Sequence, residues 1–320
     1  MNRPLAEDVE RLRARGLLSE AQAAHFGRAA RGELVSVRRE LQVALWLGVS
    51  LIAAAAGVLV KENLGRLGPV AIALGLGVAA ALCLAQVART APPFSRGRVA
   101  SPSLSFDYVL LLGVLLLGSE LAYLETRFRI LGPQWPWHLL LLAAIQLAFA
   151  FRYDSRAVLS LALASFAAWR GVALSFAAGA LAGRHEQAIR LNALAVGALF
   201  LGAGALLARA DRKAHFEPTF GNLGLMLVLG AAVAGLFGEP GLGGVWAVGL
   251  AAAAAATIAL AVRSRRSDYF AQGVVAAYVG ALRLAAELRL GTGLLYLVSA
   301  GSFGVLALIV WAHRRFKEDA

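Results

Sequence analysis

The chain has 320 residues, of which 59% are hydrophobic and 16% are charged, and its mean hydropathy is +0.69. This composition excludes an ordinary soluble domain and indicates a membrane protein. The formal net charge of +12 does not indicate nucleic-acid binding, because the basic residues lie in short segments between apolar runs rather than along one face. We therefore expect the lipid bilayer, and no nucleic acid, as a partner of the chain.

Residues 1–41 precede the first long apolar run and read as a small helical head. Two amphipathic segments, "LAEDVERLRARG" and "SEAQAAHFGRAARG", each end at a glycine, the residue that helix ends favour. Ser19 and Gln22 fit a capping box at the start of the second helix. The head carries eight Arg against six acidic residues and is too short for a DNA-binding unit, so we expect a small hairpin that either docks a cytoplasmic protein or packs on the rest of the chain. Arg38 and Arg39 are predicted to lie among anionic lipid head groups.

Apolar runs of about 18 to 22 residues follow, and at about 1.5 Å per residue each can cross a hydrocarbon core about 30 Å thick. We predict an all-α polytopic bundle over residues 42–312, followed by a basic cytoplasmic tail at 313–320. The ten predicted spans are 42–60, 67–87, 107–124, 137–151, 157–178, 188–208, 219–237, 242–262, 269–286 and 292–312. The fourth is short and the fifth must include Arg170, so eight spans is the alternative count. The charged start lacks the order of a cleaved signal peptide, and we expect the first span to be retained.

The loops between these spans alternate in Lys and Arg content, as the positive-inside rule requires. One side holds 22 of the 31 basic residues: the eight Arg before residue 42 and those of the segments 89–98, 152–156, 209–213, 263–266 and 314–317. We therefore predict a protein of the bacterial inner membrane with both termini in the cytoplasm. The loops on the other side are short, which argues against a receptor with an external binding domain.

An acidic residue opens four of the spans that run from inside to outside. These residues are Asp107 in "SFDY", Asp154 in "RYDS", Glu217 in "HFEP" and Asp268 in "RSDY". The repetition has two interpretations. It is either the trace of duplicated two-helix hairpins, or the effect of acidic residues that cap free backbone N–H groups at helix starts and suit the positive end of the helix dipole.

The N-terminal third also carries a family resemblance. The segment "LRARGLLSEAQ", a basic turn, "ELQVALWLGVSLIAAAAGVLVKENL" and the hydrophobic hairpins that follow resemble the bacterial membrane-protein family called domain of unknown function 2157. That family has no established activity and supplies no catalytic residues. The resemblance implies a multi-span inner-membrane protein with an N-terminal helical head.

Ionisable residues inside the spans are the first functional candidates, because a charge in mid-bilayer costs about 2.5 to 3.5 kcal/mol. Glu120, Arg170 and Arg283 all lie about 20 to 24 Å from the cytoplasmic edge on helices of the same direction. Glu120 can therefore pair with either arginine if their helices are neighbours. The further polar candidates for a pathway are Gln146, Gln272, Asn192 and Asn222.

Two other interpretations of these charges stand beside a pathway. Glu120 and Arg283 can reach the outer interface, with Arg283 bonded to Glu287 one turn on, or an ion pair can simply hold two helices together. Two functions follow: a permease for a small solute or ion, and a non-transporting scaffold or sensor whose head binds a partner. The predominantly apolar spans weaken the first, and the lack of a recognisable partner domain weakens the second.

Catalytic and metal-binding patterns are not readable in the sequence. The five histidines are scattered without ligand spacing, and no Ser/His/Asp arrangement is visible, so we expect neither an enzyme nor a metal site or cofactor. The single cysteine, Cys83, lies in an apolar run and excludes an intrachain disulfide. A second copy of the chain is the remaining partner to consider.

Overall fold

The computed structural model describes residues 11–16, 18–20, 22–24, 26, 38–63, 68–178, 185–238, 243–288 and 292–318. These residues form helices joined by turns, without any β-strand in the described segments. The predicted all-α class is therefore confirmed. The chain divides into two compact units, residues 1–59 and 60–320, and each is described by itself.

The first unit contains the described part of the predicted head and most of α3 (Arg38–Asn63). The capping box is present: the Ser19 N–H donates to Gln22 Oε1 at 3.0 Å, and the Gln22 N–H donates to Ser19 Oγ at 3.2 Å. Gly16 has a φ of 72°, the left-handed conformation expected where the first amphipathic segment ends. The side chains of Arg38 and Arg39 lie outside the described part of the chain, so their predicted lipid contacts stay a prediction.

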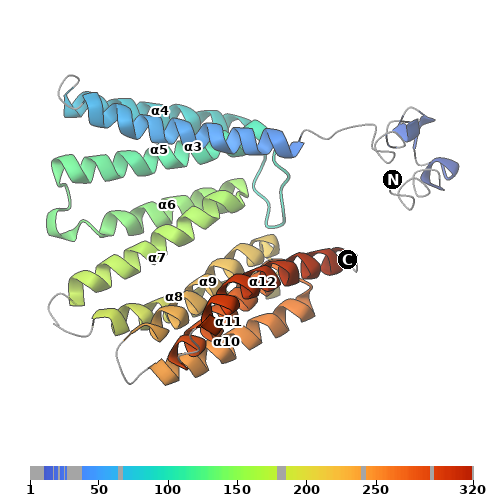
Figure 1. The fold of residues 1–320 in the computed structure, drawn as a ribbon. Helices are drawn as coiled ribbons and strands as arrows, with labels where there is room; N and C mark the ends of the chain where they lie inside the picture. The colour runs from blue at the N-terminus through green and yellow to red at the C-terminus, as the bar shows by residue number, and fades with distance from the viewer. Residues whose placement is uncertain are drawn as a thin grey trace. The chain divides into compact units, whose positions relative to one another are not determined.

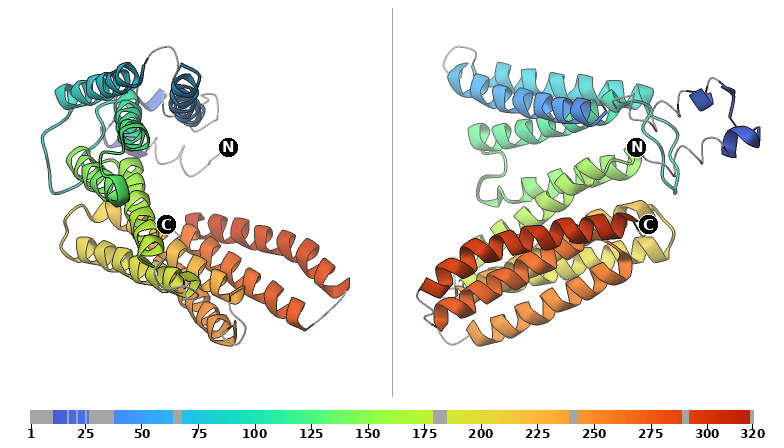
Figure 2. Two further views of the ribbon diagram at one scale, coloured as in Figure 1. Left: turned by 90° about the vertical axis from the view of Figure 1, so that its left-hand side faces the viewer. Right: turned by 45° about the vertical axis from the view of Figure 1, so that its right-hand side comes forward.

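The second unit is a series of helix pairs (Figure 1). Its helices are α4 (Pro69–Thr90), α5 (Leu104–Phe128), α6 (Trp137–Tyr153), α7 (Arg156–Ala178), α8 (His185–Arg209), α9 (Glu217–Leu236), α10 (Gly243–Ser264), α11 (Ser267–Glu287) and α12 (Thr292–Glu318), with the short 3-10 helices η1 (Gly132–Gln134) and η2 (Ala214–Phe216). α4 packs on α5, α6 on α7, α8 on α9 and α10 on α11, while α12 packs on α11. Both views of Figure 2 show α10, α11 and α12 side by side.

Six of the described helices are long and apolar enough to cross a membrane, namely α4, α5, α8, α9, α10 and α11. The chain is therefore a multi-pass membrane protein. Ten spans were predicted, and the other four correspond to α3, α6, α7 and α12. Of these, α6 has only 17 residues, and α3, α7 and α12 include side chains outside the described set. Apolar side chains that point outward, such as Val248 at 72% exposure and Phe303 at 75%, suit contact with lipid.

α9 is the helix with the most neighbours, and it contacts α7, α8, α10 and α11. Its glycines permit this closeness. Gly221 lies under the hydroxyl of Tyr269 on α11, Gly224 lies against the backbone of α8, and Gly235 lies under the indole of Trp246 on α10. A Cβ atom at Gly221 would lie 1.7 Å from the Tyr269 hydroxyl oxygen. Small residues at such contacts let membrane helices approach closely and gain van der Waals contact.

The largest apolar core joins α5, α6, α7, α8 and α9 near the end where the turns within the pairs lie. Leu110 and Phe216 have no exposed surface in it. Phe216 meets Phe151 edge to face with ring centroids 5.2 Å apart, and Phe200 meets Phe220 in the same way at 6.3 Å. This core holds the turns of neighbouring helix pairs close enough for their polar side chains to meet.

Candidate functional site

Glu120 is the carboxylate that interrupts the apolar face of α5. It lies eight residues before the end of that helix, which is about 12 Å along the axis at about 1.5 Å per residue. Its carboxylate packs on Gly77 of α4: a Cβ atom at Gly77 would lie 2.5 Å from Glu120 Oε2 and 2.9 Å from Oε1. Glycine therefore leaves the recess that the carboxylate fills.

The Oε2 atom of Glu120 is buried and has no hydrogen-bond partner among the described residues. When the carboxylate is ionised, this oxygen lacks a hydrogen-bond donor among the described residues, which is costly inside a membrane. A bound proton or a bound cation removes this cost, because either one neutralises the charge. Glu120 is thus chemically suited to take up and release a proton or a small cation.

Neither arginine of the predicted layer meets Glu120 through an ion pair in the described part of the chain. The Arg170 guanidinium lies 5.6 Å from the ring centroid of Trp169, its neighbour in the sequence. Arg283 forms an ion pair with Glu287 Oε1 at 3.0 Å on its own helix and lies 5.6 Å from the ring of Phe237. Arg283 therefore pairs with Glu287 one turn further along its own helix, as one of the predicted alternatives stated.

The other polar candidates form separate local contacts. Ser165 Oγ on α7 donates to Gln146 Oε1 on α6 at 2.8 Å, and Gln146 is only 3% exposed. Gln272 Nε2 on α11 donates to Asn222 Oδ1 on α9 at 2.9 Å. Asn192 Oδ1 on α8 is buried without a hydrogen-bond partner among the residues described. These contacts lie on different helix pairs and do not converge on Glu120.

A cluster of charges joins the turns of neighbouring pairs, and Asp154 lies at its centre, with 3% of its side chain exposed. The backbone N–H of Val99, in the loop between α4 and α5, donates to Asp154 Oδ2. His215 Nε2 donates to Oδ1, and Lys213 Nζ lies 3.2 Å from Oδ2. The Lys213 side chain is also 3% exposed and lies over the ring of Phe94. The turn between α6 and α7 is therefore bound to two other connecting segments.

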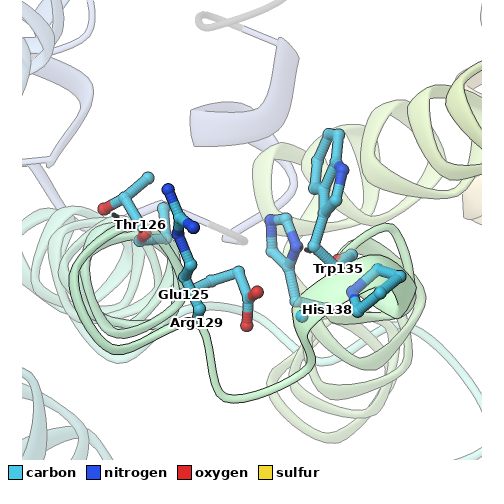
Figure 3. A pocket seen from close by; sticks show the side chains of 8 residues that line it. Glu125, Thr126, Arg129, Trp135 and His138 are labelled. Atoms are coloured by element: carbon cyan, nitrogen blue, oxygen red, sulfur yellow. Dashed lines mark hydrogen bonds between the residues drawn. The ribbon is translucent and has the colours of Figure 1, made fainter.

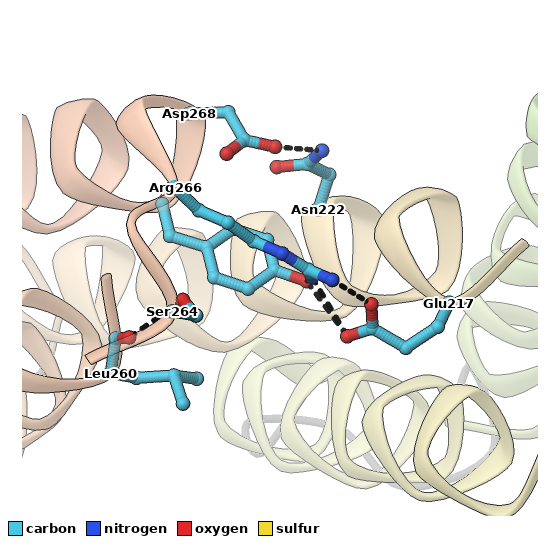
Figure 4. A network of polar contacts seen from close by, with 7 residues as sticks. Glu217, Asn222, Leu260, Ser264, Arg266 and Asp268 are labelled. Carbon is cyan, nitrogen blue, oxygen red and sulfur yellow. Dashed lines mark hydrogen bonds and ion pairs between the residues drawn. The ribbon is translucent and has the colours of Figure 1, made fainter. Parts of the chain in front are cut away.

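A second cluster joins the pair α8–α9 to the pair α10–α11 (Figure 4). Arg266 donates from Nη1 to Glu217 Oε1 at 2.9 Å and from Nη2 to Glu217 Oε2. Arg266 Nη1 also donates to the Tyr269 hydroxyl at 2.7 Å. The hydrogen bond to Glu217 raises the pKa of the Arg266 guanidinium, so the arginine stays charged. Beside this pair, Asn222 Nδ2 donates to Asp268 Oδ2 at 2.6 Å. We call the six residues Asp154, Lys213, His215, Glu217, Arg266 and Tyr269 the turn network.

Capping by the acidic residues Asp107 and Asp154 is a wrong prediction. The cap of α5 is Ser103, whose Oγ accepts the Phe106 N–H at 3.2 Å, and Ser155 Oγ accepts the Val158 N–H of α7 at 3.4 Å. Serine reaches the free N–H groups with its short side chain, while the carboxylates reach other groups. Asp107 accepts a hydrogen bond from Ser101 Oγ at 2.6 Å, and Asp154 binds the neighbouring turns.

Sequence reasoning missed the partners of these acidic residues, although a signal was present. The turns of neighbouring pairs each place a base close to an acid, as in "DRKAHFE" and "RRSDY". An acid that opens one helix and a base in the next turn along the chain are natural ion-pair partners once the turns lie at the same end. In the described residues, no group of three or more His, Cys, Asp or Glu side chains is arranged to hold a metal ion.

Comparisons with protein-family models, with curated proteins and with solved structures find no match for the chain. The class of protein is therefore defined by its own fold and contacts. It is a multi-pass helical membrane protein in which one span carries a buried carboxylate oxygen that has no hydrogen-bond partner among the described residues. Ion-paired turns at one end join its helix pairs.

Proposed function

We propose that the chain is a permease for a small ion or solute, in which Glu120 binds and releases a proton or small cation. The observation that carries the proposal is the buried Oε2 of Glu120, which has no partner among the described residues. The acidic residues at the turns differ in this respect. Asp107, Asp154, Glu217 and Asp268 each accept hydrogen bonds that explain their presence structurally. An intramembrane carboxylate without a structural partner is the kind of group on which proton relays are built.

The proposed topology has ten spans and places both termini in the cytoplasm of a bacterial inner membrane. Helices α3 to α12 lie over the ten predicted ranges, which supports this count. The basic turns within the helix pairs lie at one end, which supports a single cytoplasmic side under the positive-inside rule. Membership of the domain of unknown function 2157 family is part of this proposal and rests on the resemblance of the N-terminal segment.

A second candidate function is a non-transporting scaffold or sensor whose residues 1–41 bind a cytoplasmic protein. One observation favours it: the polar contacts Gln146–Ser165, Asn222–Gln272 and Arg283–Glu287 are separate and do not line one continuous path with Glu120. Polar contacts of this kind hold membrane helices together without a transport role.

Proton uptake by proteoliposomes distinguishes the two candidates. Purified full-length protein is reconstituted into vesicles that contain a pH-sensitive dye, and a potassium gradient with valinomycin supplies the driving potential. A permease of the proposed kind acidifies the vesicle interior faster than protein-free vesicles do. Equal rates in the two preparations, also when Na⁺ replaces the proton gradient and is followed with a sodium-sensitive dye, would reject the permease and leave the scaffold.

A further inference from the structure

The connection between α5 and α6 encloses a cavity of about 660 Å³ at the end of the helices opposite the turn network. Its walls include Glu125, Thr126 and Arg129 from the end of α5, and Trp135 and His138 from the start of α6. Figure 3 shows the first three residues on one side of the opening and the last two on the other. The volume is within the range of small-molecule sites, about 300 to 1,000 Å³.

Two opposite charges line this cavity without pairing. Glu125 is 9% exposed, and its Oε2 accepts the Leu131 N–H at 2.9 Å, a bond that leaves Oε1 uninvolved. Arg129 follows Glu125 by four residues, a spacing that usually gives an ion pair on a helix. Here Arg129 has left the helix with a φ of 50°, and its guanidinium forms no ion pair in the described residues. The left-handed backbone thus keeps the two charges apart.

The opposite wall of the cavity is aromatic and held in place. His138 Nδ1 is hydrogen-bonded to the carbonyl oxygen of Trp135, and the two rings stack with centroids 5.5 Å apart. This bond fixes the imidazole ring with Nδ1 as its donor, so Nε2 of the neutral ring is a hydrogen-bond acceptor. A cationic group held by Glu125 can therefore donate a second hydrogen bond to the far side of the cavity.

Exposed apolar residues lie next in sequence to the residues that line the cavity. Ile130 is 66% exposed, Phe128 is 42% exposed and Leu131 is 37% exposed, at the end of a helix long enough to span a membrane. Trp137 beside them is 53% exposed, as an aromatic residue at a membrane surface would be. Apolar side chains in this number would be unfavourable in water, but they suit contact with acyl chains. The cavity therefore opens at the level of the lipid head groups.

We propose that this cavity binds the head group of a zwitterionic phospholipid that carries a primary ammonium group, of the phosphatidylethanolamine class. The phosphate lies at Arg129, the ammonium lies at Glu125 and His138, and the acyl chains run beside Ile130 and Leu131. A head group with a phosphate but no ammonium leaves the Glu125 charge unmatched and beside an anion, so the site discriminates against it. This inference does not depend on Glu120 or on the permease function.

Native mass spectrometry of the full-length protein in a non-ionic detergent tests the proposal with phosphatidylethanolamine and phosphatidylglycerol of identical chains. Arg129→Gln should weaken phosphatidylethanolamine binding by at least about tenfold, since it removes a charge-assisted hydrogen bond to the phosphate. Glu125→Gln keeps an oxygen acceptor for the Leu131 N–H and should remove the preference for phosphatidylethanolamine. Arg127→Gln is the matched control, because Arg127 is exposed in the same turn and does not line the cavity; it should bind as the unmodified protein does.

Two results would overturn the proposal. The first is equal affinity of the unmodified protein for the two lipids, or an Arg129→Gln variant indistinguishable from Arg127→Gln. The second is binding of glycerophosphoethanolamine, which has the head group without chains, as tightly as the lipid, because the ligand would then be a soluble zwitterion. Thermal unfolding of each variant in the same detergent verifies that the fold is retained. Neither result bears on proton uptake through Glu120.

Discussion

Arg266 donates two hydrogen bonds to the carboxylate of Glu217, across 49 residues of sequence. Arg266 immediately precedes α11 and Glu217 opens α9, so this contact fixes the turn of one helix pair to the start of another helix. Asp154 and Lys213 do the same between the α6–α7 turn and the α8–α9 turn. The helix pairs of the second unit are thus joined at one end by specific charge pairs, in addition to apolar packing.

The contribution of the bidentate hydrogen bond from Arg266 to Glu217 can be tested by replacing Arg266 with Lys. Lysine keeps the charge but cannot present two planar donors to one carboxylate. We expect a loss of about 1 to 2 kcal/mol in the free energy of unfolding, measured as a lower thermal midpoint in detergent. Arg263→Lys is the control, because Arg263 is an exposed arginine of the adjoining turn of α10. Equal midpoints for the two variants would show that the paired donors contribute nothing.

Replacing Asp154 should lower the free energy of unfolding more than replacing Lys213 does. Asp154→Asn removes the charge that serves both Lys213 and His215, and it leaves the buried ammonium of Lys213 uncompensated, at a cost of about 3 to 5 kcal/mol. Lys213→Met is expected to cost less, because Asp154 keeps its bonds from Val99 and His215. Thermal unfolding of both variants measures the difference. A Lys213→Met variant less stable than Asp154→Asn would contradict this assignment.

Any side chain at position 221, which is glycine, is predicted to clash with Tyr269 and destabilise the protein. An alanine Cβ there would overlap the Tyr269 hydroxyl, which is held in the turn network by Arg266. Gly221→Ala should therefore lower stability by about 1 to 3 kcal/mol, as overpacking does. Gly230→Ala on the same helix has no atom within 4 Å of the new Cβ and should be neutral or stabilising by up to about 1 kcal/mol. Similar thermal midpoints for both variants would show that α9 and α11 are further apart than described.

The orientation of the protein is tested by cysteine labelling in a Cys83→Ala background. Ala100 lies in the loop between α4 and α5, and Gln134 lies in η1, in the connection between α5 and α6; both are exposed. An impermeant maleimide added to intact cells should label Gln134→Cys, and it should label Ala100→Cys only after the membrane is permeabilised. The reverse pattern would place the basic turns outside and reject the predicted topology.

The sequence allowed the helices and their approximate limits to be predicted, because both depend on local pattern. Runs of apolar residues define the helices, and a lone carboxylate in such a run is visible without a structure. The neighbours of a membrane helix are different, because they depend on packing between segments far apart in the chain. Glu120 therefore lies on Gly77 rather than beside Arg170 or Arg283, and no local pattern indicated this contact.

The acidic residues at the turns illustrate the same limit. Their position at the starts of spans predicted capping, which is a local interaction, and Ser103 and Ser155 perform it instead. The carboxylates of Asp154 and Glu217 bind residues 49 to 61 positions away in the sequence. Only the alignment of the turns at one end of the helix pairs brings these groups together.

Proton uptake by proteoliposomes that contain Glu120→Gln tests the central claim most directly. The substitution keeps the size of the side chain and removes the group that exchanges a proton, so we expect uptake to fall to the rate of protein-free vesicles while the thermal midpoint is retained. Glu287→Gln is the matched control, because Glu287 is half exposed at the end of a spanning helix and is paired with Arg283. It should leave uptake as in the unmodified protein. Uptake by Glu120→Gln at the rate of the unmodified protein would contradict the account.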